Sequence, residues 1–166
     1  MNETIADHDI AIIATSCRFP AGAESPEKFW SNLQNGVDAI RDVPQNRFNW
    51  RRFFSDDQQK PGTTYVARGG FLDWDPEMFE PAQFGISPRE AENMDPQQRI
   101  LLILTEELFS RAGYKVDAFK GSDTGVFVGG FCVDNLLLKL GFNNWDAINL
   151  HTATGSTLTM LANRIS

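Results

Sequence analysis

The feature that most constrains this 166-residue sequence is the stretch ISPREAENMDPQQRILL, residues 86–102, which contains two helix starts within ten residues. Ser87 precedes a proline and stands three residues before Glu90, which matches an S-x-x-E capping box. Asp95 also precedes a proline, and Gln98 stands three residues after it. Proline is favoured at the first helical position, where its missing N–H leaves no hydrogen bond unmade. The stretch therefore predicts a short helix followed directly by a longer one.

The longer helix is predicted to run about four turns, from Asp95 to Gly113, and it is apolar on most sides. Its apolar residues at helical spacing are Ile100, Leu101, Leu104, Leu108 and Ala112, widened by Leu102, Ile103 and Phe109. A helix with so wide an apolar surface is expected to be buried on most sides. We therefore interpret Asp95 and Gln98 as caps of a central packing element rather than as catalytic groups.

Two short apolar runs, IAIIAT (residues 10–15) and TGVFVGG (residues 124–130), are typical of strands buried on both faces. Together with the intervening helices they predict an α/β layer fold with a parallel sheet. Such folds place sites at the carboxyl ends of strands, where Cys17 and Cys132 stand. Either cysteine could be a nucleophile, but small buried cysteines packing near strand ends are the favoured interpretation.

A further helix is predicted at SPEKFWSNLQNG. Ser25 is its expected N-cap, Gly36 its stop, and its buried side is formed by Phe29, Trp30 and Leu33.

Weaker patterns fill the rest of the chain. Residues 37–85 are irregular, with a possible hairpin in TTYVARGGFL, residues 63–72. DNLLLKLG is predicted to form a short helix capped by Asp134, and residues 155–166 have helical character.

Composition and motifs exclude several classes. The net charge of -7 argues against a nucleic-acid surface. Two cysteines and two histidines offer no metal cluster and no disulfide framework. The apolar runs are too short to span a membrane, and the polar, acidic N-terminus is not a targeting peptide, so a cytoplasmic setting is expected.

No dinucleotide, phosphate-loop or nucleophile-elbow motif is present. The residues alone predict an α/β protein without a complete active site.

The amino-acid sequences of four segments are specific enough to indicate a family. Residues 10–30, 65–102, 124–130 and 153–166 resemble the N-terminal half of the ketosynthase domain of modular polyketide synthases. The string FGISPREAENMDPQQR is close to diagnostic of that family, and the resemblance covers residues 9–166 in the family's order and spacing. It implies a tail at 1–9 and, over 10–166, a truncated beta-ketoacyl synthase N-terminal domain. The implied fold is an incomplete thiolase-like one (layered α/β/α/β/α), the first part of the N-terminal half only.

The resemblance also implies a chemistry, decarboxylative Claisen condensation. An acyl chain passes from the phosphopantetheine arm of an acyl carrier protein to a cysteine activated at a helix N-terminus. A malonyl-type unit then loses carbon dioxide and attacks the thioester, while two histidines stabilise the oxyanion. No cofactor is implied to bind directly. The implied partners are acyl carrier protein, a second copy of the intact domain, and further synthase domains downstream.

None of the family's three catalytic positions matches a residue of this sequence. Cys17 belongs to the family's CRFP element, which is structural, and His151 matches neither catalytic histidine. The resemblance places the acyl pocket and the dimer contact just after the second apolar run. The candidate substrate-binding residues are therefore Gly129, Gly130, Phe131 and Cys132.

Three hypotheses remain at this point. The chain is the front of a ketosynthase, a non-catalytic half-domain that binds an intact ketosynthase or carrier protein, or the remnant of a decayed gene. The apolar runs favour the first, whereas Glu106, polar where the family is aromatic, favours the second. Alone, the chain is expected to expose large apolar patches and to be unstable or to aggregate.

Overall fold

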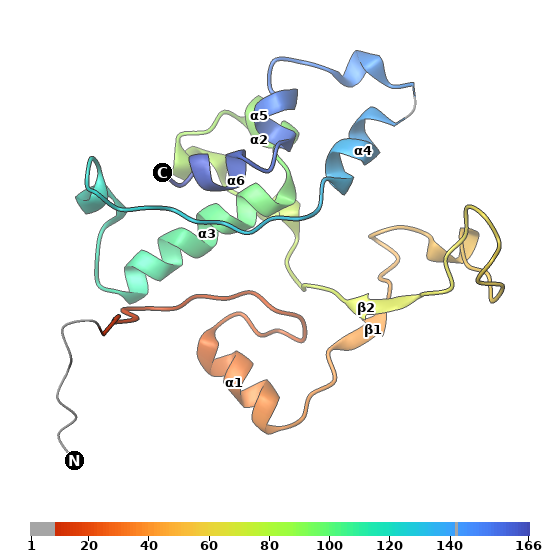
Figure 1. Ribbon diagram of the computed structural model, residues 1–166, viewed down its shortest axis with the longest axis horizontal. Coiled ribbons are helices and arrows are strands. Elements are labelled where there is room, and N and C mark those ends of the chain that lie inside the picture. Colours follow the sequence, from red (N-terminus) through yellow and green to blue (C-terminus); the bar gives the residue numbers. More distant parts are fainter. Residues whose placement is uncertain (1–8, 142) are drawn as a thin grey trace. The chain divides into compact units, whose positions relative to one another are not determined.

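The structure, a computed structural model, describes residues 9–141 and 143–166 (Figure 1). The chain forms two compact units. The smaller unit is Cys17–Trp74, and the larger unit comprises the described residues of Asp75–Ser166 together with residues 9–16.

In the smaller unit, helix α1 (Pro26–Gln34) begins as predicted. The Ser25 side chain accepts a hydrogen bond from the N–H of Lys28 at 3.2 Å, and Gly36 follows the helix with a φ of 61°. The predicted buried side is wrong, because no residue of α1 is buried, and Trp30 and Leu33 are 60% and 55% exposed.

The strands of the smaller unit form a two-stranded antiparallel ribbon. Strand β1 (Ile40–Asp42) pairs with β2 (Arg68–Gly70), with Ile40 opposite Gly70. The hairpin predicted within residues 63–72 is therefore wrong. The partner of β2 lies before a long excursion that carries the short helix η1 (Trp50–Arg52). A sequence window of ten residues cannot contain such a pairing.

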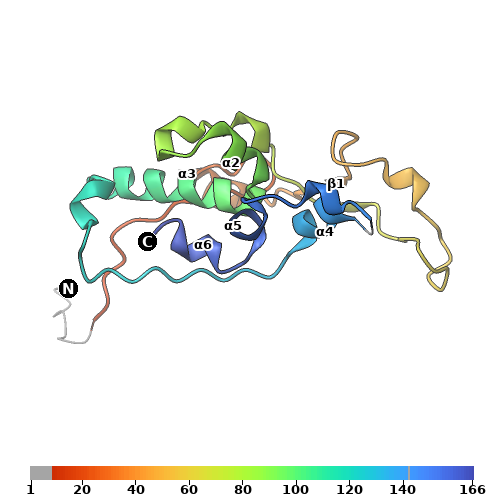
Figure 2. The same cartoon turned by 90° about the horizontal axis from the view of Figure 1, so that it is seen from above.

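The larger unit is mainly helical. Its elements are η2 (Pro76–Met78), η3 (Pro81–Phe84), α2 (Pro88–Asn93), α3 (Pro96–Arg111), η4 (Val116–Phe119), α4 (Asp134–Leu140), η5 (Trp145–Ala147), α5 (Thr152–Ser156) and α6 (Met160–Asn163). In the view of Figure 2, α3 lies between α2 on one side and α6 on the other. Residues 155–166, which were predicted to have helical character, do not form one continuous helix. They contain the end of α5 and the whole of α6, and the extended backbone of Thr157 separates the two helices.

The core of the larger unit surrounds the junction of α2 and α3. Its buried members are Phe79, Ala91, Met94 and Leu102. Phe79 stacks on Phe84 with ring centroids 5.3 Å apart. Within α3, only Gln98 and Leu102 are buried. The helix is central, as predicted, but much of its apolar surface is only half covered.

Both predicted helix starts are confirmed. The Ser87 hydroxyl accepts from the N–H of Glu90 at 3.2 Å, and an Asp95 carboxylate oxygen accepts from the N–H of Gln97 at 2.8 Å. The cap predicted for α4 is wrong: Val133 occupies the N-cap position, and Asp134 stands in the first turn.

We expect Asp95→Ala to lower the free energy of unfolding of the larger unit by about 1–2 kcal/mol, the usual cost of removing a helix cap. Asp95 is 5% exposed, so water cannot readily replace its carboxylate. The measurement is amide hydrogen exchange across α3. The matched control is Asp134→Ala, which removes no cap and should cost only a few tenths of a kcal/mol through the helix dipole. Equal effects of the two changes would contradict the capping role.

Residues 10–15 and 124–130, predicted as strands, follow an extended course in Figure 1 but belong to no assigned strand among the described residues. Their apolar side chains are also exposed to solvent: Ile10 and Ile12 are 93% and 83% exposed, and Phe127 is 95% exposed. The prediction of two paired, buried strands is therefore wrong for this chain. The physical reason is that a strand in a sheet depends on its neighbours for hydrogen bonds and cover.

Helix α3 nevertheless joins the two extended segments as a crossover. The carbonyl of Thr15 accepts from Arg111 Nε at 3.1 Å, and the next residue, Ser16, donates to the carbonyl of Leu104 at 2.8 Å. The carbonyl of Cys132 accepts from Gln97 Nε2 at 3.1 Å, at the first turn of α3. Both segments thus run against the direction of α3 and parallel to each other (Figure 1). No described helix is long and apolar enough to cross a membrane.

Candidate functional site

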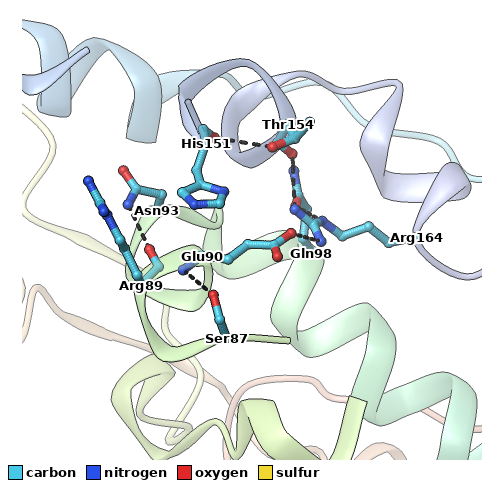
Figure 3. A network of polar contacts seen from close by, with 8 residues as sticks. All are labelled: Ser87, Arg89, Glu90, Asn93, Gln98, His151, Thr154 and Arg164. Atoms are coloured by element: carbon cyan, nitrogen blue, oxygen red, sulfur yellow. Dashed lines mark hydrogen bonds and ion pairs between the residues drawn. The ribbon is translucent and has the colours of Figure 1, made fainter. Parts of the chain in front are cut away.

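The most developed polar site of the larger unit is built around Arg164, which follows α6 (Figure 3). Its side chain is 9% exposed. Nη1 lies 2.8 Å from Oε1 of Glu90 on α2, and Nε donates to Oε1 of Gln98 on α3 at 2.5 Å. Gln98 in turn donates from Nε2 to the carbonyl of Thr154 on α5 at 3.1 Å. One guanidinium and one amide therefore connect four helices.

This network was not predicted from the sequence, although it uses two residues of the predicted caps. The Glu90 carboxylate pairs with Arg164 instead of closing the capping box, so only the Ser87 half of the box is formed. Gln98 is 1% exposed and bonds to residues 56 and 66 positions away. The sequence did contain one indication of this network, which is the presence of an Arg within an apolar helical segment. An Arg buried there must find a partner for its charge.

The C-terminus of α2 is a second polar centre. Lys139 on α4 donates from Nζ to the carbonyls of Glu92 and Asn93 at 3.2 and 2.8 Å. Burial lowers the pKa of Lys139, the positive charge of Arg99 lowers it further, and Asp95 opposes both effects. Lysine here serves as a helix C-cap, the role that suits a cation at that end of a helix.

A cavity of about 480 Å³ lies beside this centre. Lys139, Thr152 and Ser156 are among its lining residues. Ser156 is 5% exposed, and its hydroxyl has no hydrogen-bond partner within the described part of the chain. A larger hollow of about 860 Å³ lies between η3, η4, α3 and α6, with Phe84 and Phe109 on its walls.

The residues predicted to bind substrate lie at the end of the second extended segment. A Cβ built on Gly130 would stand 2.5 Å from Cδ1 of Leu161, whereas one on Gly129 would meet nothing within 4 Å. Phe131 is 91% exposed. Cys132 is exposed, which contradicts its interpretation as a small buried cysteine. Neither of the two hollows is lined by these four residues, so their role in substrate binding stays a prediction.

The remaining candidates for chemistry are dispersed. Cys17 is half-buried in the smaller unit, and His151 is the N-cap residue of α5. Across the described residues, no group of three or more histidine, cysteine, aspartate or glutamate side chains could hold a metal ion. The groups that the structure brings together are therefore packing and capping groups.

Two parallel extended segments joined by a crossover helix, without an assembled nucleophile site among the described residues, define a partial layered α/β protein. Comparison with known proteins makes the class specific. The profile described as beta-ketoacyl synthase, N-terminal domain, matches residues 7–166. The chain belongs to this family.

The relatives are polyketide synthases. A reducing polyketide synthase of Botryotinia fuckeliana is 38% identical over 164 residues, which are 98% of this chain and 6% of that protein. A hybrid PKS-NRPS synthetase of Dothistroma septosporum is 44% identical over 158 residues, 95% of this chain and 4% of that one. The chain thus spans about a twentieth of the length of these relatives.

Solved ketosynthases confirm the fold. The oxazolomycin ketosynthase domain KS7 of Streptomyces albus matches with a TM-score of 0.80 and 34% identity. The match covers 93% of this chain and 26% of that one. The ketosynthase from module 6 of the bacillaene synthase of Bacillus subtilis matches with a TM-score of 0.73 and 32% identity. The predicted fold, an incomplete thiolase-like α/β fold, is therefore confirmed.

Proposed function

We propose that this chain is the N-terminal part of a polyketide synthase ketosynthase that elongates an acyl chain by decarboxylative Claisen condensation. The observation that carries the proposal is the match to a solved ketosynthase over 93% of the chain at a TM-score of 0.80. The family profile over residues 7–166 and the polyketide synthase relatives support it.

The reaction consists of two transfers. The acyl group leaves the phosphopantetheine thiol of an acyl carrier protein and forms a thioester with the enzyme cysteine, which activation as a thiolate makes nucleophilic. A malonyl-type unit on a carrier protein then releases carbon dioxide. Its α-carbon attacks the thioester, and the cysteine thiol is freed. The protein supplies positioned groups for this chemistry and binds no cofactor of its own.

The 166 residues alone are proposed not to catalyse condensation. The family resemblance places the nucleophilic cysteine and both histidines in segments without a counterpart here. Cys17 and Cys132 match no catalytic position, and these two thiols lie in different units. In the intact domain, Gly129, Gly130, Phe131 and Cys132 are proposed to lie beside the acyl group, and a second copy, acyl carrier protein and downstream synthase domains are the proposed partners.

The alternative of a self-sufficient binding half-domain is less well supported. Glu106 is exposed and its carboxylate accepts a hydrogen bond from Gln83, so this polar substitution is satisfied on the surface. The two extended segments, however, keep bare apolar side chains, among them Ile12 and Phe127. A half-domain adapted to stand alone would cover or replace such residues.

An acylation experiment tests the proposal. The 166-residue chain and a continuous chimera are each incubated with an acyl-pantetheine thioester and weighed by mass spectrometry. In the chimera, the chain is followed by the rest of the ketosynthase domain of the Dothistroma relative. We expect no acyl adduct on the chain alone and one adduct per chimera.

The matched control is the chimera with Cys17→Ser, which should keep full acylation because Cys17 is a half-buried cysteine of the smaller unit and is neither the proposed nucleophile nor a proposed substrate-binding residue. Acylation of the chain alone, at either of its cysteines, would disprove the proposal, as would a folded chimera that takes no acyl group. An antibody against residues 86–102 gives an independent check in the source cell. A product far longer than 166 residues is expected. A product of 166 residues would instead favour the binding half-domain or the decayed gene.

A further inference from the structure

The backbone of Phe131, one of the residues proposed to lie beside the acyl group, is held in place on both sides. On one side, a Cβ at Gly130 would stand 2.5 Å from Cδ1 of Leu161, a residue that is only 4% exposed. On the other side, the carbonyl of Cys132 accepts a hydrogen bond from Nε2 of Gln97 at 3.1 Å. The backbone of Phe131 therefore lies between two fixed points.

The same stretch of chain continues into α4, and Lys139 attaches that helix to α2. Nζ of Lys139 donates to the carbonyls of the last two residues of α2, Glu92 and Asn93, at 3.2 and 2.8 Å. Carbonyls at the end of a helix lack partners within the helix and attract a cation. Residues 129–140 are thus held against the junction of α2 and α3 by two side chains, Gln97 near one end and Lys139 at the other.

The side chain of Phe131 depends on this support, because it is 91% exposed and is hardly covered by the described residues. Its direction is therefore set by its backbone rather than by packing. An aromatic ring offers a large apolar area to a ligand, and a ring on a fixed backbone offers that area at a constant position. Groups held in place before binding cost less entropy to organise when the ligand arrives.

We propose that Gln97 and Lys139 are positioning residues of the ketosynthase, which hold residues 129–140 against the α2–α3 junction and thereby determine how well a long acyl chain is bound. The inference rests on the proposed function, whose substrate recognition it specifies. Neither residue touches the acyl group, and both act through the backbone that carries Phe131. If the two contacts served only to stabilise the fold, their loss would affect short and long acyl groups equally.

The test uses the continuous chimera of the acylation experiment with acetyl-pantetheine and octanoyl-pantetheine, and mass spectrometry follows the rate of acylation at increasing thioester concentration. In Lys139→Met the side chain cannot donate to the two carbonyls, so α4 is released from α2. The KM for octanoyl transfer should rise about fivefold or more with kcat nearly unchanged, the pattern of a lost binding contribution. The KM for acetyl transfer should change by less than about twofold, because the acetyl group presents little apolar area to Phe131.

Two further variants check the mechanism. Gln97→Met removes the Nε2 donor to the Cys132 carbonyl while keeping a side chain of similar length, and it should give the same pattern as Lys139→Met. Lys139→Arg should restore the octanoyl KM, because a guanidinium keeps the charge and can donate to both carbonyls.

Ser87→Ala is the matched control for a general loosening of this region. It removes the N-cap of α2 and alters neither of the two contacts. It should lower stability and leave the ratio of the octanoyl KM to the acetyl KM unchanged.

Equal rises for the two thioesters, an unchanged octanoyl KM in Gln97→Met, or the same pattern in Ser87→Ala would overturn the positioning role. If Lys139→Met fails to fold, Gln97→Met carries the test alone. Amide hydrogen exchange in the chimera reports the attachment of α4 without any acyl transfer. Exchange within α4 should quicken about tenfold in Lys139→Met and stay unchanged in Lys139→Arg.

These readouts distinguish the two proposals. A wild-type chimera that takes no acyl group but shows the expected exchange would overturn the proposed function and leave the attachment of α4 standing. A chimera that is acylated, with the same octanoyl KM in all variants, would leave the proposed function standing and overturn the positioning role.

Discussion

Replacing Gly155 with alanine is expected to destabilise the larger unit by about 3 kcal/mol, at the upper end of the cost of overpacking. A Cβ at this position would stand 2.2 Å from the carbonyl oxygen of Asn93 and 2.8 Å from its carbonyl carbon. Both atoms are backbone, so no side-chain rotation can relieve the contact. Helix α5 would have to move away from α2, which would also break the 2.7 Å hydrogen bond from the Asp95 N–H to the Gly155 carbonyl.

The measurement is the free energy of opening of α2 and α3 from amide hydrogen exchange in the 166-residue chain. Gly129→Ala is the matched control, since an added Cβ there meets nothing within 4 Å. Its effect should stay within about 0.5 kcal/mol, as for an uncrowded surface position. If Gly155→Ala cost no more than Gly129→Ala, the close approach of α5 to α2 would be disproved.

The helix starts were predictable because their determinants are local. Ser25, Ser87 and Asp95 each accept a hydrogen bond from a backbone N–H two or three residues ahead, within the reach of a short sequence window. Asp134 shows the limit of this reasoning. An acidic residue at the start of a helix can stand either at the cap or in the first turn, and boundaries shift by one residue.

Pairing was not predictable, because it depends on residues far away. The apolar pattern of residues 124–130 correctly indicated an extended backbone, but no property of the segment says whether a neighbour is present. Phe127 consequently stands 95% exposed where a buried position was predicted. The same limit explains the failed hairpin, since the partner of β2 lies at residues 40–42.

The candidate site also has features that the sequence indicated and contacts that it did not. The family resemblance predicted substrate binding at Gly129, Gly130, Phe131 and Cys132, and this stays a prediction. The structure adds that Leu161 would crowd a side chain at Gly130. The links from Glu90 and Gln98 to Arg164 span 74 and 66 residues, and each residue alone has a local explanation as part of a cap. The packing of the helices determines which distant polar residues meet. That packing cannot be read from a single sequence.

Arg164→Met is expected to lower the free energy of opening of α3 by about 3 kcal/mol, since removing one partner of a buried ion pair leaves the other uncompensated. The change strands the Glu90 carboxylate, 28% exposed, and the Gln98 oxygen, while methionine fills much of the vacated space. Lys120→Met is the matched control. Its ion pair with Asp117 is 3.7 Å long with both side chains at least 86% exposed, and such surface pairs contribute at most about 0.5 kcal/mol here.

A second substitution distinguishes a stranded charge from lost packing. If the cost of Arg164→Met arises from the unpaired Glu90 carboxylate, then adding Glu90→Leu should recover at least about 1 kcal/mol, because apolar replacement of both partners is often close to neutral. If the cost arises from lost contacts of the arginine side chain, the double variant should be no more stable than the single one. Hydrogen exchange across α2 and α3 in the four chains of this cycle measures the coupling directly. A coupling within about 0.3 kcal/mol of zero would mean that the two residues act independently. The four-helix junction would then be held by packing around Met94 and Leu102 rather than by the guanidinium.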